Sequence, residues 1–307
     1  MLAVEIKGLV KTYGKVNAVN NIDLKIPMGS IYGFLGPNGA GKTTTIKMLT
    51  GIAKPTSGEI KIFGEKVHFG SNKNRKDIGF LPDVPNFYNW MRAKEYLRFS
   101  GKLLSVEPKE LEERIDRLLE KTGLTGVNKK IGNYSRGMKQ RLGIAQALIG
   151  NPRIVFLDEP TSALDPIGRK EVIDIILSLK NKVTVFFSTH ILSDVEKVCD
   201  RVVILDKGNA IVEDTIENLK INYSHHIISL ETLPGDIVQI ETALSKLELV
   251  EKVEHSDNST LLVHVKDLAK AGLEIPAIFN KHHIPLIGYS NVETSLEDIF
   301  LKAVNNK

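Results

Sequence analysis

A glycine-rich segment, residues 36–43, constrains this chain more than any other feature of its sequence. It reads Gly-Pro-Asn-Gly-Ala-Gly-Lys-Thr and matches the pattern of a phosphate-binding loop in full. The mainly apolar residues 31–35 precede it and predict a short buried strand, whereas residues 42–50 predict a helix. A strand that enters a helix through such a loop predicts an α/β fold with a phosphate site where the strand ends.

The residues of this loop form the first predicted site. Pro37 has no N–H group, so the backbone donors must come from residues 38–44. Lys42 would place its positive charge on the β- and γ-phosphate oxygens, and the Thr43 hydroxyl can bind Mg²⁺, which prefers oxygen ligands. The residues predicted to contact a nucleotide here are Gly36, Pro37, Asn38, Gly39, Ala40, Gly41, Lys42, Thr43 and Thr44.

A second group of polar residues follows two later strands. Residues 154–157 are apolar, and Asp158 and Glu159 come directly after them. We expect Asp158 to hold Mg²⁺ and Glu159, on the opposite side of the pleat, to take the proton from an attacking water. His190 follows the predicted strand 183–188 and would contact the γ-phosphate and orient that water. Together these residues predict phosphoryl transfer to water at one edge of a parallel sheet.

The periodicity of apolar residues predicts the organisation of the rest of this domain. Residues 88–150 carry apolar residues at helical spacing, which predicts a helical subdomain inserted into the core. Short apolar runs at 154–157, 183–187 and 202–205 are separated by helices, as in a buried parallel sheet. Alternating residues near the N-terminus predict further strands, so we expect a mixed β-sheet core in a domain that spans residues 1–219.

The remaining residues, 222–307, predict a second, smaller domain. Their pattern has the order βαββαβ, which is typical of a ferredoxin-like α+β fold. A closing helix is expected at 295–304. The predicted strands are 226–230, 250–255, 260–265 and 284–289, and the predicted helices are 237–247 and 269–281. No group of reactive side chains stands out in this region.

The segment Tyr134–Arg141 indicates which phosphate-loop family the chain resembles. It is similar to the signature loop of ABC-transporter ATPases, usually written Leu-Ser-Gly-Gly-Gln, which Ser135 and Gly137 match. The phosphate loop, this segment, the Asp-Glu strand, the Ser-Ala-Leu-Asp segment 162–165 and His190 occur in the order of that family. The resemblance implies the fold of a phosphate-loop ABC cassette.

Three features of the sequence resemble one branch of this family. The signature loop has other residues at positions 134, 136 and 138, and Asp83 stands where the family usually has glutamine. The chain also closes with Ser-Leu-Glu-Asp-Ile-Phe-Leu at residues 295–301. These features resemble ATPases that power drug, antibiotic-peptide, polysaccharide and ion exporters.

The resemblance implies ATP and Mg²⁺ as cofactors and a head-to-tail dimer, either a homodimer or a pair with a related cassette. Ser135 and Gly137 of one subunit would close over the ATP held by the other, and Asp165 would communicate between the two sites. Tyr13 lies where the family stacks an aromatic ring on adenine. Asp83 is expected to bind Mg²⁺ or act on the attacking water. A separate integral-membrane permease would carry the substrate.

Composition limits the location and the partners that we expect. The net charge of +4 is small and the basic residues are dispersed, which predicts no nucleic-acid partner. The single cysteine, Cys199, suits a reducing compartment and is expected to be buried. No apolar run approaches the roughly 18 residues of a membrane span. We therefore expect a cytoplasmic protein that is peripheral on the inner face of the cell membrane.

Other functions are compatible with parts of this pattern. The alternative is a soluble ABC ATPase that acts on ribosomes or other macromolecules, but such proteins usually carry two cassettes or a long coiled coil, and this chain has one cassette and no heptad run. A regulatory module that binds ATP without hydrolysis would not need Glu159 and His190. A phosphate-loop kinase or GTPase would not need the signature segment.

Overall fold

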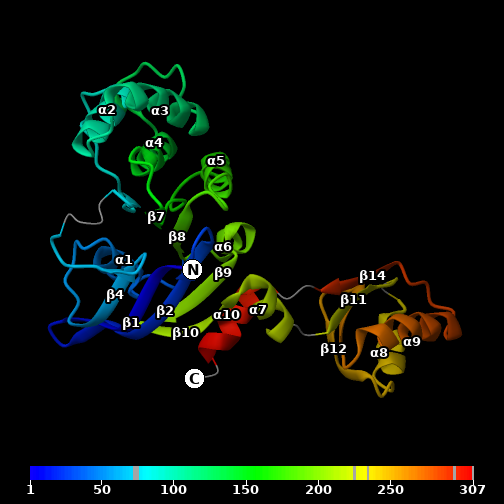
Figure 1. The fold of residues 1–307 in the computed structure, drawn as a ribbon. Coiled ribbons are helices and arrows are strands. Elements are labelled where there is room, and N and C mark those ends of the chain that lie inside the picture. Colours follow the sequence, from blue (N-terminus) through cyan, green and yellow to red (C-terminus); the bar gives the residue numbers. More distant parts are fainter. Residues whose placement is uncertain (72–75, 224–225, 234, 293–294, 306–307) are drawn as a thin grey trace. The chain divides into compact units, whose positions relative to one another are not determined.

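The computed structural model describes residues 1–71, 76–223, 226–233, 235–292 and 295–305. The chain divides into two compact units (Figure 1). The first unit comprises Met1–Ile216 together with the last residues from Ala303, and the second comprises Glu217–Lys302.

A six-stranded sheet forms the centre of the first unit, in the order β10-β9-β3-β8-β7-β6. The strands from β9 to β6 run parallel, and β10 pairs with β9 in an antiparallel hairpin. Every residue of β3, β7 and β8 is buried, as expected for central parallel strands. The bounds are β3 Ile31–Leu35, β6 Ile78–Leu81, β7 Ile154–Asp158, β8 Thr184–Thr189, β9 Arg201–Asp206 and β10 Asn209–Thr215.

A second sheet of the first unit is antiparallel, with the order β2-β1-β4-β5. Its long strands alternate buried and exposed residues, so that one face enters the core. The bounds are β1 Leu2–Tyr13, β2 Val16–Pro27, β4 Ser57–Ile62 and β5 Glu65–Lys66. The expectation of a mixed α/β core is therefore confirmed, although the strands form two sheets rather than one.

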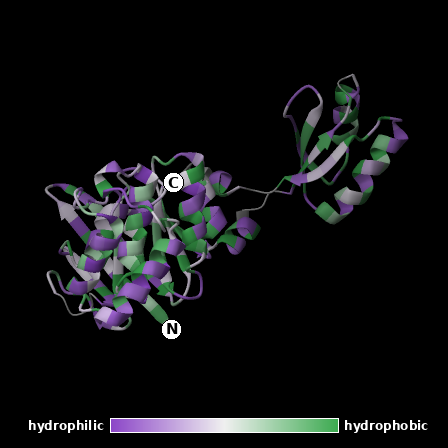
Figure 2. Cartoon of the chain, turned by 90° about the horizontal axis from the view of Figure 1, so that it is seen from above, coloured by the Kyte–Doolittle hydropathy of each residue, from purple (hydrophilic) through white to green (hydrophobic). Residues whose placement is uncertain are grey.

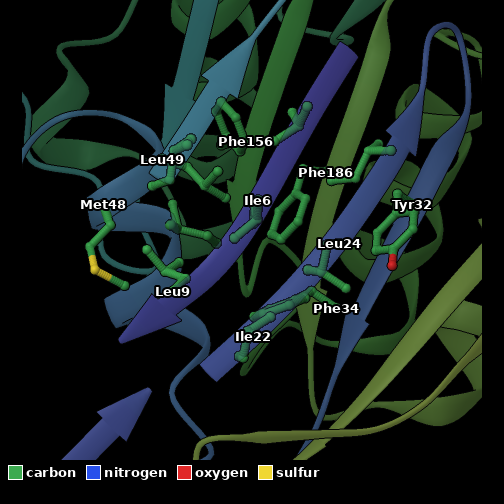
Figure 3. Packing of buried hydrophobic residues seen from close by; sticks show 14 of the residues in the cluster. Ile6, Leu9, Ile22, Leu24, Tyr32, Phe34, Met48, Leu49, Phe156 and Phe186 are labelled. Atoms are coloured by element: carbon green, nitrogen blue, oxygen red, sulfur yellow. The ribbon is translucent and has the colours of Figure 1, made fainter. Parts of the chain in front are cut away.

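The core of the first unit lies between these two sheets and helix α1 (Lys42–Leu49) (Figure 3). Its aromatic centre is Phe186, whose ring centroid lies 4.9 Å from that of Phe34 and 5.5 Å from that of Phe156. Fully burying one such side chain stabilises the fold by about 1.5–3 kcal/mol. Because these residues belong to β3, β7 and β8, the same packing fixes the strand ends that carry the polar residues.

Helices α2 to α4 form a group above the end of β7 and β6 (Figure 1). They are α2 Ala93–Leu103, α3 Pro108–Lys121 and α4 Arg136–Leu148. A short 3₁₀ helix, Ile131–Asn133, lies between α3 and α4. Helices α5 (Pro166–Leu177) and α6 (Leu192–Val198) follow β7 and β8. Cys199 ends α6 and is buried, as predicted.

The second unit has its own core around an antiparallel sheet in the order β12-β13-β11-β14, with α8 and α9 on one face (Figure 1). Hydrophilic and hydrophobic residues alternate along its helices, as expected for helices that bury one side (Figure 2). The elements of this unit are β11 Ile227–Glu231, α8 Ile237–Leu244, β12 Val250–His255, β13 Thr260–Val265, α9 Leu268–Lys281 and β14 Gly288–Val292. Helices α7 (Ile216–Tyr223) and α10 (Leu296–Asn305) cross the boundary between the two units.

The last strand of this unit differs from the prediction. It spans Gly288–Val292, whereas the sequence pattern predicted 284–289. Ile284 is instead buried in the core of the second unit, and the Pro285 carbonyl accepts a hydrogen bond from the Thr232 hydroxyl (3.1 Å). Since proline has no N–H group for a strand ladder, pairing begins later. The ferredoxin-like assignment of this unit stays a prediction.

Candidate functional site

The glycine-rich loop joins β3 to α1 and has little space for side chains at two positions. A Cβ atom on Gly41 would lie 2.3 Å from the Ala18 carbonyl oxygen, and one on Gly36 would lie 2.6 Å from the Leu205 carbonyl oxygen. Gly41 also has a φ of +99°, in the left-handed region that favours glycine. The loop therefore keeps its conformation only with glycine at these positions, and it ends at the N-terminus of α1, where N–H groups favour an anion.

Lys42, the first residue of α1, is held by three oxygen atoms. Its Nζ donates to the carbonyl oxygens of Gly36 (2.7 Å) and Pro37 (3.1 Å) and lies 3.1 Å from Glu159 Oε1. Lys42 is only 6% exposed and Glu159 is 7% exposed. A buried charge is costly unless it is paired and its hydrogen-bonding groups are satisfied. Lys42 and Glu159 therefore each depend on the other for a charge partner.

Glu159 does not continue strand β7, which differs from the expected placement on the opposite side of the pleat. The strand ends at Asp158, and Glu159 has a φ of +48°. Its N–H donates to the Ser188 carbonyl oxygen (3.0 Å), and its Oε2 lies 2.9 Å from His190 Nδ1. The left-handed turn therefore directs the Glu159 carboxylate between Lys42 and His190.

Asp158 is 1% exposed and lies beside the loop. The Ser188 hydroxyl donates to Asp158 Oδ1 (2.7 Å), which follows from the pairing of these two residues in β7 and β8. Burial raises the pKa of Asp158, and the hydrogen bonds from Ser188 and Thr43 oppose this rise. The negative charges of Glu159 and Asp83 raise the pKa of Asp158 further. A cation at this position would favour the ionised form.

The donor set around Asp158 fits Mg²⁺ on chemical grounds. The Thr43 hydroxyl forms a hydrogen bond with Asp158, and the charge of Asp83 acts on Asp158. The oxygen atoms of all three side chains are hard ligands. Within the described ranges, no group of three or more His, Cys, Asp or Glu residues could hold a metal by itself. Mg²⁺ usually binds through one or two carboxylates plus phosphate oxygens, and this arrangement is of that kind.

Asp83 comes two residues after β6 and approaches α4. Its Oδ1 lies 3.9 Å from an Arg136 guanidinium nitrogen, and its carbonyl oxygen accepts a hydrogen bond from Gln140 Nε2 (3.1 Å). Gln140 is buried. The backbone of Asp83 is thus tied to α4, the helix that begins within the predicted signature segment, while its charge acts on Asp158.

Ser135 and Gly137 lie at the start of α4, and their contacts are local. Ser135 caps this helix, with its hydroxyl accepting from the Met138 N–H (3.2 Å). A Cβ atom on Gly137 would lie 3.9 Å from Gly168 Cα in α5. Asp165 caps α5 in the same way, accepting from the Gly168 N–H (3.1 Å). The two caps therefore belong to the junction of α4 and α5, whereas α1 packs against β2, β7 and β8.

Tyr13 ends β1 and is 52% exposed. The Lys11 ammonium lies 4.8 Å from the centre of its ring. An exposed ring at the end of a strand can stack on another flat group, and the adenine role of Tyr13 stays a prediction.

Sequence reasoning missed two sets of supporting residues. Ser188 bonds to Asp158 and also lies 3.2 Å from the Glu159 N–H, which donates to it. The carboxylate of Asp194 is buried and accepts from the Thr161 hydroxyl (2.7 Å) and from Arg169 Nε (2.7 Å). Asp194 thereby links α6 to the loop after Glu159 and to α5. In the sequence, the signal for Ser188 and Asp194 was a single polar residue among apolar ones. Their partners could not be predicted, because these depend on the order of the strands in the sheet.

Comparison with known proteins identifies the family. Residues 19–162 match the family described as ABC transporter. An uncharacterized ABC transporter ATP-binding protein of Bacillus subtilis is 39% identical over 306 residues, which cover 99% of this chain and 100% of that protein. The bacitracin transport ATP-binding protein of Bacillus licheniformis is 38% identical over 300 residues, 96% of this chain and 95% of that protein.

A third relative and a solved structure agree with these matches. The daunorubicin/doxorubicin resistance ATP-binding protein of Streptomyces peucetius is 32% identical over 301 residues, 97% of this chain and 91% of that protein. The solved structure of an ATP-binding subunit of an ABC transporter superposes with a TM-score of 0.66 at 29% identity, covering 73% of this chain and 93% of that one. No helix among the described residues has the length and apolar composition needed to cross a bilayer. The chain therefore belongs to the ABC transporter family of ATP-binding proteins, the ATP-hydrolysing subunits of these transporters.

Proposed function

We propose that this chain powers an exporter by binding and hydrolysing Mg-ATP. The observation that carries the proposal is the continuous set of contacts from Lys42 through Glu159 to His190, at 3.1 and 2.9 Å, beside the phosphate loop. This set brings a phosphate-binding cation, a carboxylate and an imidazole together at the carboxyl ends of the parallel strands. Phosphoryl transfer depends on positioning and charge neutralisation more than on covalent help, so such an arrangement suits it.

In this proposal each residue has one role. The loop N–H groups and Lys42 bind the β- and γ-phosphates, and Thr43 and Asp158, with Asp83, hold Mg²⁺, which would neutralise phosphate charge. Glu159 accepts the proton of the attacking water, and His190 orients that water towards the γ-phosphate. The left-handed turn at Glu159 and its bond to Ser188 support the base role, because they hold the carboxylate in one place.

The proposal includes a dimer, because the Ser135 and Gly137 contacts belong to a different part of the first unit than those of Lys42. Two chains arranged head to tail would let the α4 N-terminus of one meet the ATP held by the other. The helix N-terminus and the Ser135 hydroxyl suit a phosphate. Asp165, at the adjacent start of α5, would then lie between the two sites. The partner is a second copy or a related cassette.

An apolar surface beside α2 supports a membrane partner. The ring centroids of Tyr88 and Trp90 lie 6.0 Å apart in a tilted arrangement, and the ring centroid of Phe99 lies 5.7 Å from that of Tyr88. Trp90 is 66% exposed, and the exposed apolar residues nearby in the sequence include Val84 and Leu103. Clustered exposed aromatic residues are typical of protein interfaces. We propose that an integral-membrane permease binds here, which would keep this chain on the cytoplasmic face of the membrane.

Export rather than import is favoured by the relatives. One is named for bacitracin transport and another for daunorubicin and doxorubicin resistance. The signature departures at 134, 136 and 138 and the aspartate at position 83 point in the same direction. We therefore propose that the partner permease moves its substrate out of the cell.

The test is to identify what co-purifies with tagged Glu159→Gln protein from detergent-solubilised native membranes in Mg-ATP. Slowed hydrolysis should trap the complex, so a polytopic membrane protein without its own cassette is expected. Glu113→Gln, an exposed change on α3, is the matched control and should retain less partner. Recovery of only ribosomal or other soluble proteins would remove transport from the function and favour a soluble ABC ATPase.

A further inference from the structure

A groove of about 520 Å³ separates α3 from the segments that follow α4 and precede β8. One face of α3 lines it with residues spaced at i, i+4, i+7 and i+11, namely Glu110, Arg114, Arg117 and Lys121. Lys182 lies on the opposite wall. Four cations thus line the groove against a single carboxylate; Arg117 and Lys182 are exposed, and Arg114 and Lys121 are half-buried.

Most of this positive charge is uncompensated. Arg114 pairs with Glu110 and donates to the Ile149 carbonyl oxygen (2.7 Å), so its charge is already used at the end of α4. In the part of the chain that the structure describes, Arg117 and Lys121 form no ion pair. Lys182 donates to the Ser178 carbonyl oxygen (3.3 Å), which carries no charge.

The two walls repel each other through their lysines. Burial lowers the pKa of Lys121, and the charge of Lys182 lowers it further. Leu118, Leu148 and Leu179 also line the groove and provide no polar groups that could offset the charge. An apolar floor weakens dielectric screening, so a negative group bound here would interact more strongly than one on an open surface.

We propose that this groove is an anion site that binds the phosphate group of an organic phosphate ester. Arg117 can offer a planar pair of donors to two phosphate oxygens, and Lys121 and Lys182 can supply point charges from opposite walls. The phosphate could belong to a free metabolite or to a phospholipid headgroup, since both present the same chemistry. A bound phosphate would connect α3 to Lys182, two residues before β8.

The test compares two double variants of the full chain with equal charge loss. Arg117→Gln with Lys182→Gln removes one cation from each wall. Lys109→Gln with Lys197→Gln is the control, because both lysines are exposed and lie outside the groove. Binding of glycerol 3-phosphate is measured by calorimetry with saturating Mg-ADP to occupy the phosphate loop. Binding to phosphatidylglycerol vesicles, against phosphatidylcholine vesicles, is measured by flotation.

The wild type and the control should bind, and the groove variant should bind roughly tenfold or more weakly, because it loses two charge-assisted contacts. If the groove variant binds glycerol 3-phosphate more weakly, the ligand is a free ester. If only its binding to vesicles is weakened, the ligand is a phospholipid. Should the wild type bind neither probe, or should the two double variants weaken equally, the proposal is wrong. In the wild type, the Lys121 side-chain NMR titration should also move to higher pH when the bound probe is added; an unchanged titration would contradict the site without relying on a variant.

Discussion

In the first unit the parallel strands β7 and β8 end in buried polar side chains, whereas in the second unit the notable carboxylates lie on the surface of an antiparallel sheet and its loops. Burial raises the pKa of Asp158. In the second unit, a hydrogen bond from Lys252 lowers the pKa of Glu254, and the Lys270 N–H lowers that of Asp267. Both units contain acidic residues, but among the described residues only Asp158, in the first unit, has a carboxyl group whose pKa is raised and whose ionised form a bound cation would favour.

The difference follows from topology. Parallel strands place all their carboxyl ends at one edge, so residues from distant segments meet there. Antiparallel strands alternate direction, and the carboxylates of the second unit serve short-range contacts such as the helix cap at Asp267. Changes at the strand edge should therefore affect catalysis, while changes in the second unit should affect only local stability.

The largest effect is expected for Glu159→Gln. The variant should bind ATP but lose turnover by at least ~10²-fold, which is the usual scale for a positioned general base. Steady-state ATPase assays and nucleotide titration measure the two quantities separately. Glu113→Gln should hydrolyse ATP like the wild type. Near-normal hydrolysis by Glu159→Gln would remove Glu159 from the base role.

Lys42→Ala should follow, with a loss of ATP affinity of roughly 30-fold or more. Removing one member of a buried charge pair costs about 2–5 kcal/mol, which here is the contact of Lys42 with the phosphates. Without Lys42, the Glu159 carboxylate beside it would also repel the phosphates. Fluorescence titration with an ATP analogue measures the change. Lys47→Ala, on the exposed side of the same helix, is the control. Unchanged affinity in Lys42→Ala would contradict the phosphate-loop assignment.

Asp158→Asn should have opposite effects on activity and on stability. Without Mg²⁺ or nucleotide the variant should melt roughly 1–4 °C higher than the wild type at neutral pH, since it removes a buried charge. The raised pKa means that wild-type stability falls as pH rises through that pKa, so the two melting curves should converge in acid. Mg²⁺-dependent hydrolysis should fall. A lower melting point at neutral pH would show that the ionised carboxylate is stabilising.

The smallest effect on ATP turnover is expected for Asp267→Ala in the second unit. Asp267 accepts hydrogen bonds from the Ala269 N–H (2.9 Å) and the Lys270 N–H (3.1 Å) at the start of α9. Its lowered pKa contributes stability above the usual pKa of aspartate, and this contribution is lost as pH falls through the lowered value. Calorimetry at neutral pH should show the second unit melting roughly 2–5 °C lower. ATP turnover should not change; a loss of turnover would contradict the division between the two units.

Much of the fold was predictable because local signals agreed with the final structure. Pro108 starts α3 as a proline at a first helical position should, and the apolar run 154–157 forms β7. The last strand was predicted to begin too early, at residue 284. An apolar residue such as Ile284 has the same pattern in the sequence whether it belongs to a strand or is buried in the core outside one. Its burial depends on packing that the pattern does not contain.

The sequence by itself determined the phosphate loop, the order of the motifs and the family, because these depend on residues close together along the chain. Tertiary structure decided how the site is assembled. The order β3-β8-β7 brings Ser188 to Asp158, and the left-handed backbone at Glu159 directs its carboxylate to Lys42 and His190. These contacts join residues that are 30 and 31 positions apart and, for Lys42 and Glu159, more than a hundred positions apart, and their register follows from how side chains pack between the sheets.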